Sequence, residues 1–203
     1  MRVKTESRRQ AIMKAASEIF REEGFSGSSM AMIAARVGGS KATLYNYFAS
    51  KDELFAAITF EAVDAAAQTM IQLLEGDVTD IRTTLIRFGH AYLDLILAPD
   101  VIMVTRIGIA HGPMPSLGRS LYEKGPGQGW RTIATNLKRY HDLGLLTVSN
   151  SQIAALQLKG LLEAGLFEPA LFGVRPAMPR AVMVTEAIDM FLARYGPMAD
   201  EPC

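Results

Sequence analysis

The chain has 203 residues and a mass of 22.1 kDa, and its 21 Lys and Arg balance its 21 Asp and Glu. Its length and its 49% content of apolar residues fit a globular protein with its own core, and they argue against disorder and a coiled coil. The single cysteine, Cys203, excludes an intrachain disulfide and a cysteine-cluster metal site.

The compartment is expected to be the cytoplasm, with no membrane partner. The first residues carry charges and lack the apolar segment of a secretory signal. The chain contains no run of eighteen apolar residues, the length that a membrane-spanning helix requires. A lone cysteine also fits a reducing compartment.

The zero net charge conceals an uneven distribution. Residues 1–51 hold nine basic and four acidic side chains, a net charge of +5, so that residues 52–203 carry −5. This asymmetry favours a basic module joined to an acidic one, and a basic module suits a polyanion such as DNA. A chance fluctuation in composition is the alternative.

Apolar residues recur at helical spacing along the whole chain, and alternating strand patterns are scarce, so the sequence predicts an all-α fold. Gly24 supplies a left-handed stop for the first helix, and Ser29 and Ser40 offer N-caps. Ser50 and Glu53 form a capping box. The expected helices span residues 6–24, 29–37, 41–48, 51–75, 79–97, 101–110, 116–124, 130–143, 151–172 and 178–195.

The second and third predicted helices have the layout of a helix-turn-helix. Residues 38–40 (Gly-Gly-Ser) suit the tight turn, and Leu44 and Phe48 can anchor the third helix on a core. The other side of that helix offers donor groups, which suit base edges in the major groove. Backbone amides near Ser29 and the cation of Lys51 suit phosphates.

A longer series of fixed spacings surrounds this motif. It comprises Ala15-Ala16, Ile19-Phe20, Gly24-Phe25, Ser29-Met30, Ile33-Ala34, Gly38, Ser40 to Phe48 and Ser50 to Phe55. Through these residues, the segment from Arg9 to Phe55 resembles the DNA-binding domain of the TetR family of transcriptional regulators. The resemblance implies a three-helix DNA-binding domain, for which we expect the boundaries 1–53.

The resemblance also implies roles for individual residues. Lys41 and Thr43 stand where family members touch bases or nearby phosphates. Tyr45 and Tyr47 stand where the family meets the DNA backbone and the groove wall, and Lys51 matches a phosphate-binding lysine. Asn46 is the candidate for reading adenine through a bidentate amide pair. The candidate DNA-binding residues are Ser29, Lys41, Thr43, Tyr45, Asn46, Tyr47 and Lys51.

Two residues depart from the family pattern. Gly39 replaces the usual small aliphatic residue of the turn, which is expected to loosen the packing of the third helix. Ala31 replaces a position where some members read a base with Arg. These departures leave open an alternative function, a helical interaction module that has lost specific DNA binding.

Residues 54–203 are expected to bind a small-molecule effector and to form a homodimer. The stretch from Arg106 to Pro126 resembles the AefR-type subgroup of TetR C-terminal domains, which implies a helical domain of this kind. The last two predicted helices carry apolar residues around more of their circumference than one core needs, which favours a dimer interface over a fully buried hairpin. The candidate pocket residues are Tyr92, Met103, Arg106, His111, Tyr122 and Trp130.

The sequence thus predicts a homodimeric repressor that binds a pseudo-palindromic operator in double-stranded DNA and is released by a small-molecule effector. It contains none of the common hydrolase, metalloprotease or nucleotide-binding motifs. The three histidines lack carboxylates at the spacing of a metal pair. We therefore expect no enzyme activity, no catalytic residue, no cofactor and no metal.

Overall fold

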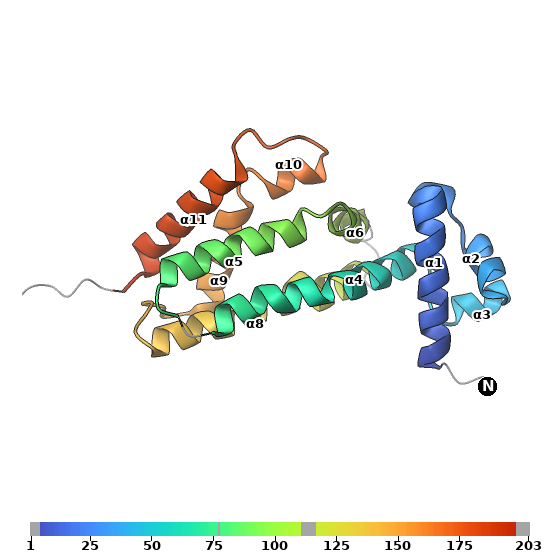
Figure 1. Cartoon of the computed structure of the whole chain (residues 1–203), viewed down its shortest axis with the longest axis horizontal. Helices are drawn as coiled ribbons and strands as arrows, with labels where there is room; N and C mark the ends of the chain where they lie inside the picture. The colour runs from blue at the N-terminus through green and yellow to red at the C-terminus, as the bar shows by residue number, and fades with distance from the viewer. Residues whose placement is uncertain (1–4, 77, 111–116, 198–203) are drawn as a thin grey trace, which may run out of the picture. The chain divides into compact units, whose positions relative to one another are not determined.

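The computed structural model describes residues 5–76, 78–110 and 117–197 (Figure 1). These residues form helices joined by short loops and contain no strand, which confirms the predicted all-α class. The chain divides into two compact units, Met1–Ala62 and Val63–Cys203.

The first unit contains α1 (Glu6–Gly27), α2 (Met30–Val37), α3 (Lys41–Tyr45) and the first part of α4 (Lys51–Glu75). Side-chain oxygens of Thr5, Ser29 and Ser40 accept hydrogen bonds from backbone amides at the starts of α1, α2 and α3. Helical spacing aligns one apolar face on each helix, and these faces form a single core. Its members include Ile12, Ala16, Ile19, Ile33, Leu44, Phe48 and Leu54.

Two helix ends in this unit differ from the prediction. Gly24 has φ +70, as its left-handed role requires, but it kinks α1, and helical hydrogen bonding continues to Gly27. The third helix ends at Tyr45 rather than Phe48. Its last turn tightens, because the amides of Tyr47 and Phe48 both donate to the carbonyl of Leu44.

The predicted capping box at the start of α4 is present in a modified form. The amide of Glu53 donates to Ser50 Oγ at 3.0 Å. The carboxylate of Glu53 reaches one residue further back than expected and accepts from the amide of Ala49 at 2.6 Å. Two amides at the helix start are thereby satisfied.

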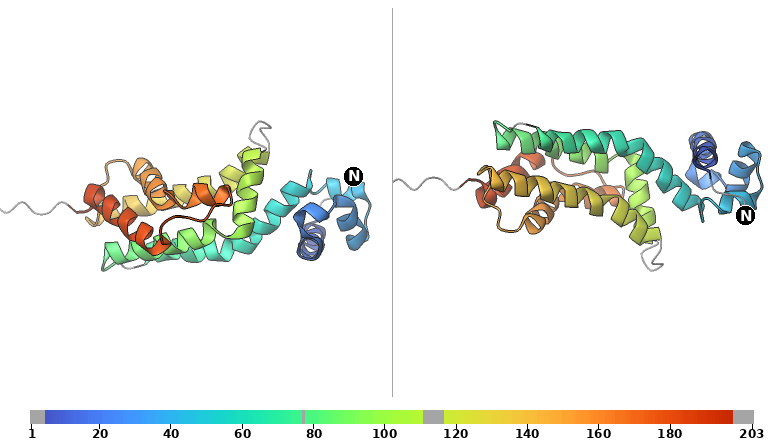
Figure 2. Two further views of the ribbon diagram at one scale, coloured as in Figure 1. Left: turned by 90° about the horizontal axis from the view of Figure 1, so that it is seen from above. Right: turned by 90° about the horizontal axis from the view of Figure 1, so that it is seen from below.

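In its described residues, the second unit contains the end of α4 and seven further helices. Helix α5 packs against α9 and α11, and α8 packs against α9 (Figure 2). Phe88, Leu93, Leu137, Tyr140 and Ile188 are completely buried in its core. The helices are α5 (Ile81–Ile96), α6 (Pro99–Ala110), α7 (Leu117–Lys124), α8 (Pro126–Asp142), α9 (Ser151–Glu163), α10 (Phe167–Leu171) and α11 (Arg180–Tyr195).

Two predicted helices of this unit differ from the structure by more than two residues. The expected helix over residues 151–172 is two helices, because Gly165 adopts φ +67 between α9 and α10. Helix α8 starts at Pro126 instead of residue 130, since proline is favoured in the first turn of a helix, where its missing N–H costs nothing.

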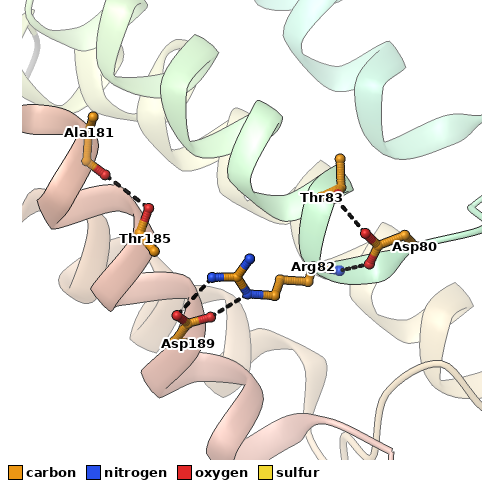
Figure 3. Close-up of polar contacts among 6 residues, drawn as sticks. All are labelled: Asp80, Arg82, Thr83, Ala181, Thr185 and Asp189. Atoms are coloured by element: carbon orange, nitrogen blue, oxygen red, sulfur yellow. Dashed lines mark hydrogen bonds and ion pairs between the residues drawn. The ribbon is translucent and has the colours of Figure 1, made fainter.

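Two exposed ion pairs link α5 to α11. The guanidinium of Arg82 donates to both carboxylate oxygens of Asp189, at 2.6 and 2.9 Å (Figure 3). Asp94, near the other end of α5, pairs with Arg180 at the start of α11, at 2.6 Å. The order of the partners shows that α5 and α11 run antiparallel. The hydrogen bonds from Arg82 hold the pKa of Asp189 below its ordinary value.

Helix α4 is long and apolar enough to cross a membrane by composition alone, with a mean hydropathy of 1.3 over eighteen residues. Leu54 near its start and Leu74 near its end are completely buried in the protein. Packing within the protein therefore accounts for the apolar character of both ends.

Candidate nucleic-acid interface and effector site

The turn between α2 and α3 has the geometry of a helix-turn-helix. Gly38 adopts the left-handed conformation (φ +69, ψ 43), and its amide bonds to the carbonyls that end α2. A side chain at this position would be strained. Ile33 on α2 and Leu44 on α3 are buried at 0% and 2% exposure, so the two helices share one core and α3 presents its other side outward.

Three of the seven predicted DNA-binding residues occupy this outward side. Lys41, Tyr45 and Asn46 are exposed, and Tyr45 retains 51% of its surface although it is aromatic. Within the described residues, none of these three side chains makes a hydrogen bond or an ion pair. A cation, a phenol and an amide are thus available together on α3 and its C-cap residue, Asn46.

Three other predicted residues have partners within the protein. Ser29 caps α2 by accepting from the amide of Met32 at 3.3 Å. The hydroxyl of Thr43 lies 3.0 Å from that of Ser40, within the cap of α3. Tyr47 is half-buried, and its hydroxyl accepts from the amide of Thr5 at 3.1 Å. These contacts give all three a structural role, and their DNA contacts stay a prediction.

Lys51, the seventh, is bound to the end of α1. Its ammonium group donates to the carbonyl of Phe25 at 2.6 Å and to that of Ser28 at 2.9 Å. The same group lies 4.3 Å from the centre of the Phe25 ring. Lys51 therefore closes the loop between α1 and α2, and a phosphate contact would use its remaining donor.

A buried polar cluster lies in the second unit. The hydroxyl of Tyr92 donates to a carboxylate oxygen of Glu163 and accepts from the indole nitrogen of Trp130 at 3.3 Å. Lys159 pairs with the other carboxylate oxygen of Glu163. Burial, followed by the charge of Glu163, raises the pKa of Tyr92, so its hydroxyl stays protonated. The cluster joins α5, α8 and α9.

Comparisons with known proteins identify both units. Residues 12–58 match the model of bacterial regulatory proteins of the tetR family. Residues 83–197, more than half of the chain, match the C-terminal domain of AefR-like transcriptional repressors. The chain belongs to the TetR family. TetR-family proteins are DNA-binding regulators and not enzymes, in agreement with the predicted absence of enzyme activity.

Several TetR-family relatives are similar to this chain. The transcriptional activator FasR of Mycolicibacterium smegmatis is 37% identical over 47% of this chain and 43% of its own length, so the match spans less than half of that relative. The nicotine-responsive repressor HdnoR of Paenarthrobacter nicotinovorans is 28% identical over 61% of this chain and 68% of its own. A TetR-family regulator from Mesorhizobium loti is 25% identical, with a TM-score of 0.77, over 95% of this chain and 100% of its own.

The predicted pocket residues of this TetR-family chain lie in different surroundings. Tyr92 and Trp130 are buried and in contact, while Met103 is half-buried on α6. Arg106 is exposed and donates to the carbonyls of Ala170 and Leu171 at the end of α10. Tyr122 is 59% exposed on α7. The predicted residue His111 lies outside the described residues. Ligand binding by these six stays a prediction.

Sequence reasoning missed Glu163, which joins Tyr92 to Lys159. Its only signal was its spacing, four residues after Lys159, which is typical of an ion pair on the exposed side of a helix. The structure instead leaves the Glu163 side chain only 15% exposed. Its hydrogen-bond partner Tyr92 lies 71 positions earlier in the chain.

Helices α9 and α11 carry an exposed apolar surface. Ile153 and Leu156 on α9 are 51% and 57% exposed, and Met190 on α11 is 63% exposed. A shallow groove runs between the two helices, and Gly160 is part of its lining. A β-carbon added at Gly160 would have no other atom within 4 Å. The groove is lined by Gln157, Gly160, Leu161, Met190, Phe191, Arg194 and Tyr195.

Proposed function

We propose that this TetR-family protein is a cytoplasmic, homodimeric repressor that binds a pseudo-palindromic operator and is released by a small-molecule effector. Residues 1–53 read the DNA, and residues 54–203 bind the effector and form the dimer. The observation that carries this proposal is the helix-turn-helix, whose third helix is anchored by Leu44 and presents Lys41, Tyr45 and Asn46 outward.

Each outward side chain of α3 has a distinct recognition chemistry. Asn46 can pair with the N6 and N7 atoms of adenine, a contact worth about 1–3 kcal/mol of discrimination. Lys41 can bind a guanine edge or a phosphate, and the Tyr45 hydroxyl can bond a phosphate oxygen. Together they provide both positioning and base recognition.

The apolar surface of α9 and α11 supports the homodimer. A two-fold axis would place the same surface of a second copy against it, and burial of Ile153, Leu156 and Met190 would supply the hydrophobic free energy. Gly160 permits a close approach of the partner helix, since it adds no side chain to the surface. The dimer must hold its two α3 helices about 34 Å apart, one turn of DNA.

The cluster of Tyr92, Trp130 and Glu163 supports effector binding in the second unit. A buried carboxylate and a phenol beside an indole can recognise a small molecule that carries both an aromatic ring and hydrogen-bonding groups. The relative HdnoR is named for its response to nicotine, a small molecule. The effector shifts the equilibrium only as far as its affinities for the DNA-bound and free states differ.

Selection of duplexes from a random 30-bp library tests the proposal. The wild-type protein should enrich a site with two-fold symmetry, and Asn46→Ala should lose discrimination at one base pair in each half-site while keeping the rest. Failure to enrich any sequence would support the alternative, an interaction module without specific DNA binding. Enrichment of an asymmetric single site would contradict the dimeric arrangement.

Sedimentation of two variants tests the dimer interface. Met190→Asp should convert the dimer to a monomer, because it places a charge in the proposed interface. Ile109→Asp is the matched control, since Ile109 is also 63% exposed but lies on α6. A dimer that survives Met190→Asp, or that both variants disrupt equally, would contradict this interface.

A further inference from the structure

Gly39 leaves a space in the helix-turn-helix that Arg8 occupies. A β-carbon built on Gly39 would lie 2.7 Å from Nη2 of Arg8, much closer than two such atoms can approach. The guanidinium group of Arg8 therefore packs directly against the backbone of the turn. Gly39, one of the two residues that depart from the family pattern, is thus the residue that leaves room for this cation.

Lys14, Arg21 and Lys41 of the first unit are exposed, whereas two arginines of the same unit have partners within the protein. Arg9 pairs with Glu6 and lies over the ring of Phe48. Arg36 is paired with Glu22 at 2.7 Å. The guanidinium of Arg8 forms no ion pair or hydrogen bond with any residue between positions 5 and 76, and it differs from the exposed cations in its contact with Gly39. Its charge is available to an external anion.

The first turn of α1 places Arg8 beside the recognition helix. Thr5, three residues before Arg8, donates its amide to Tyr47, which follows α3. Arg8 itself touches Gly39, two residues before α3 starts. The start of α1 thus contacts the segment on both sides of α3, and Arg8 lies at the end where α3 begins.

We propose that Arg8 binds a phosphate of the DNA backbone beside α3, and that Gly39 is the residue that makes room for it. The proposal rests on the proposed function, because a helix in the major groove has phosphates along both of its sides. A planar guanidinium suits a phosphate, since it can donate two parallel hydrogen bonds to its oxygens.

Two substitutions test the role of this guanidinium, one by removing it and the other by displacing it. Arg8→Gln removes the charge. Gly39→Ala adds one methyl group that displaces Nη2, and it is compatible with the backbone, because Gly39 is not among the glycines with positive φ. The atom that must move ends a flexible side chain, so the fold should tolerate the change. Thermal unfolding of each variant checks this point.

The assay is the salt dependence of binding to the duplex that the wild-type protein enriches from the random library. Arg8→Gln should weaken binding about 8-fold per bound protomer at 0.1 M salt and lower the slope of log K against log salt by about 0.9 per protomer. Gly39→Ala should produce much of the same loss. The double variant should bind no more weakly than Arg8→Gln, because both changes remove one contact.

Arg21→Gln is the matched control. Arg21 is an exposed cation on the same helix, thirteen residues further along and therefore about 20 Å from Arg8, beyond the screening length of about 10 Å at 0.1 M salt. Its slope should equal that of the wild type. An unchanged slope for Arg8→Gln, or additive losses in the double variant, would overturn the inference while leaving the proposed function intact. Absence of wild-type binding would overturn both.

Discussion

Replacement of Lys51 by methionine should destabilise the first unit. Methionine keeps an unbranched side chain of similar length but removes the ammonium that donates to the carbonyls of Phe25 and Ser28. A hydrogen bond from a charged donor contributes about 1.5–3 kcal/mol, and partial access of water to this site lowers the total for two. We expect a loss of about 2–4 kcal/mol in the free energy of opening, which corresponds to a roughly 30- to 1000-fold larger equilibrium constant for opening.

Hydrogen exchange measured by mass spectrometry is the suitable assay, because the single tryptophan, Trp130, lies in the second unit and cannot report on the first. Exchange should accelerate in peptides from residues 6–62 and stay unchanged in those from residues 81–110 and 126–195. Lys14→Met is the control, since Lys14 is an exposed lysine on α1. Exchange in Lys51→Met no faster than in Lys14→Met would refute the structural role of Lys51.

Two further predictions concern the second unit. Gly89→Ala should lower the Tm and Gly129→Ala should raise it, because a β-carbon at Gly89 would lie 2.9 Å from a buried leucine methyl, whereas at Gly129 it would meet nothing within 4 Å. Over-packing at Gly89 costs about 1–3 kcal/mol, whereas alanine at Gly129 gains about 1 kcal/mol in helix propensity. A higher Tm for both variants would contradict the packing at Gly89. The pKa of Asp189 is lowered by Arg82, so the ionised carboxylate stabilises the fold above the ordinary value of 3.8, and this contribution is lost as the pH falls through the lower folded pKa. The difference in Tm between wild type and Asp189→Asn should therefore be constant from pH 7 to 5 and disappear in stronger acid, and a difference that persists there would disagree with this linkage.

The sequence predicted the helices of the first unit well because their limits depend on local signals. Ser29 and Ser40 cap helices through atoms only three residues away, and Gly38 ends α2 by its own conformation. Boundaries were less accurate where apolar periodicity continued through a break, as at Gly165. A glycine inside an apolar helical pattern is compatible with a continuous helix, and tertiary packing decides whether the chain turns there.

For the candidate sites, the sequence predicted which residues face outward better than it predicted their contacts. Periodicity placed Leu44 inward and Tyr45 outward on α3, and both positions hold in the structure. The partners of Lys51 could not be predicted, because they are backbone carbonyls 23 and 26 positions earlier. Glu163 was missed for a similar reason. A long-range contact that involves a single side chain leaves no periodic signal in one sequence.

The middle of α4 is a helical segment that lies outside both hydrophobic cores. From Glu61 to Thr69 no residue of this helix is buried, and five of these nine positions are alanine or valine. Neither core holds this segment, so its order depends on the intrinsic preference of alanine for the helix. An exchange of Ala65 for glycine would cost about 1 kcal/mol of local helix stability and leave both cores intact. The stiffness of this helical segment can thus change through single substitutions, independently of the residues that we propose to read DNA or to bind an effector.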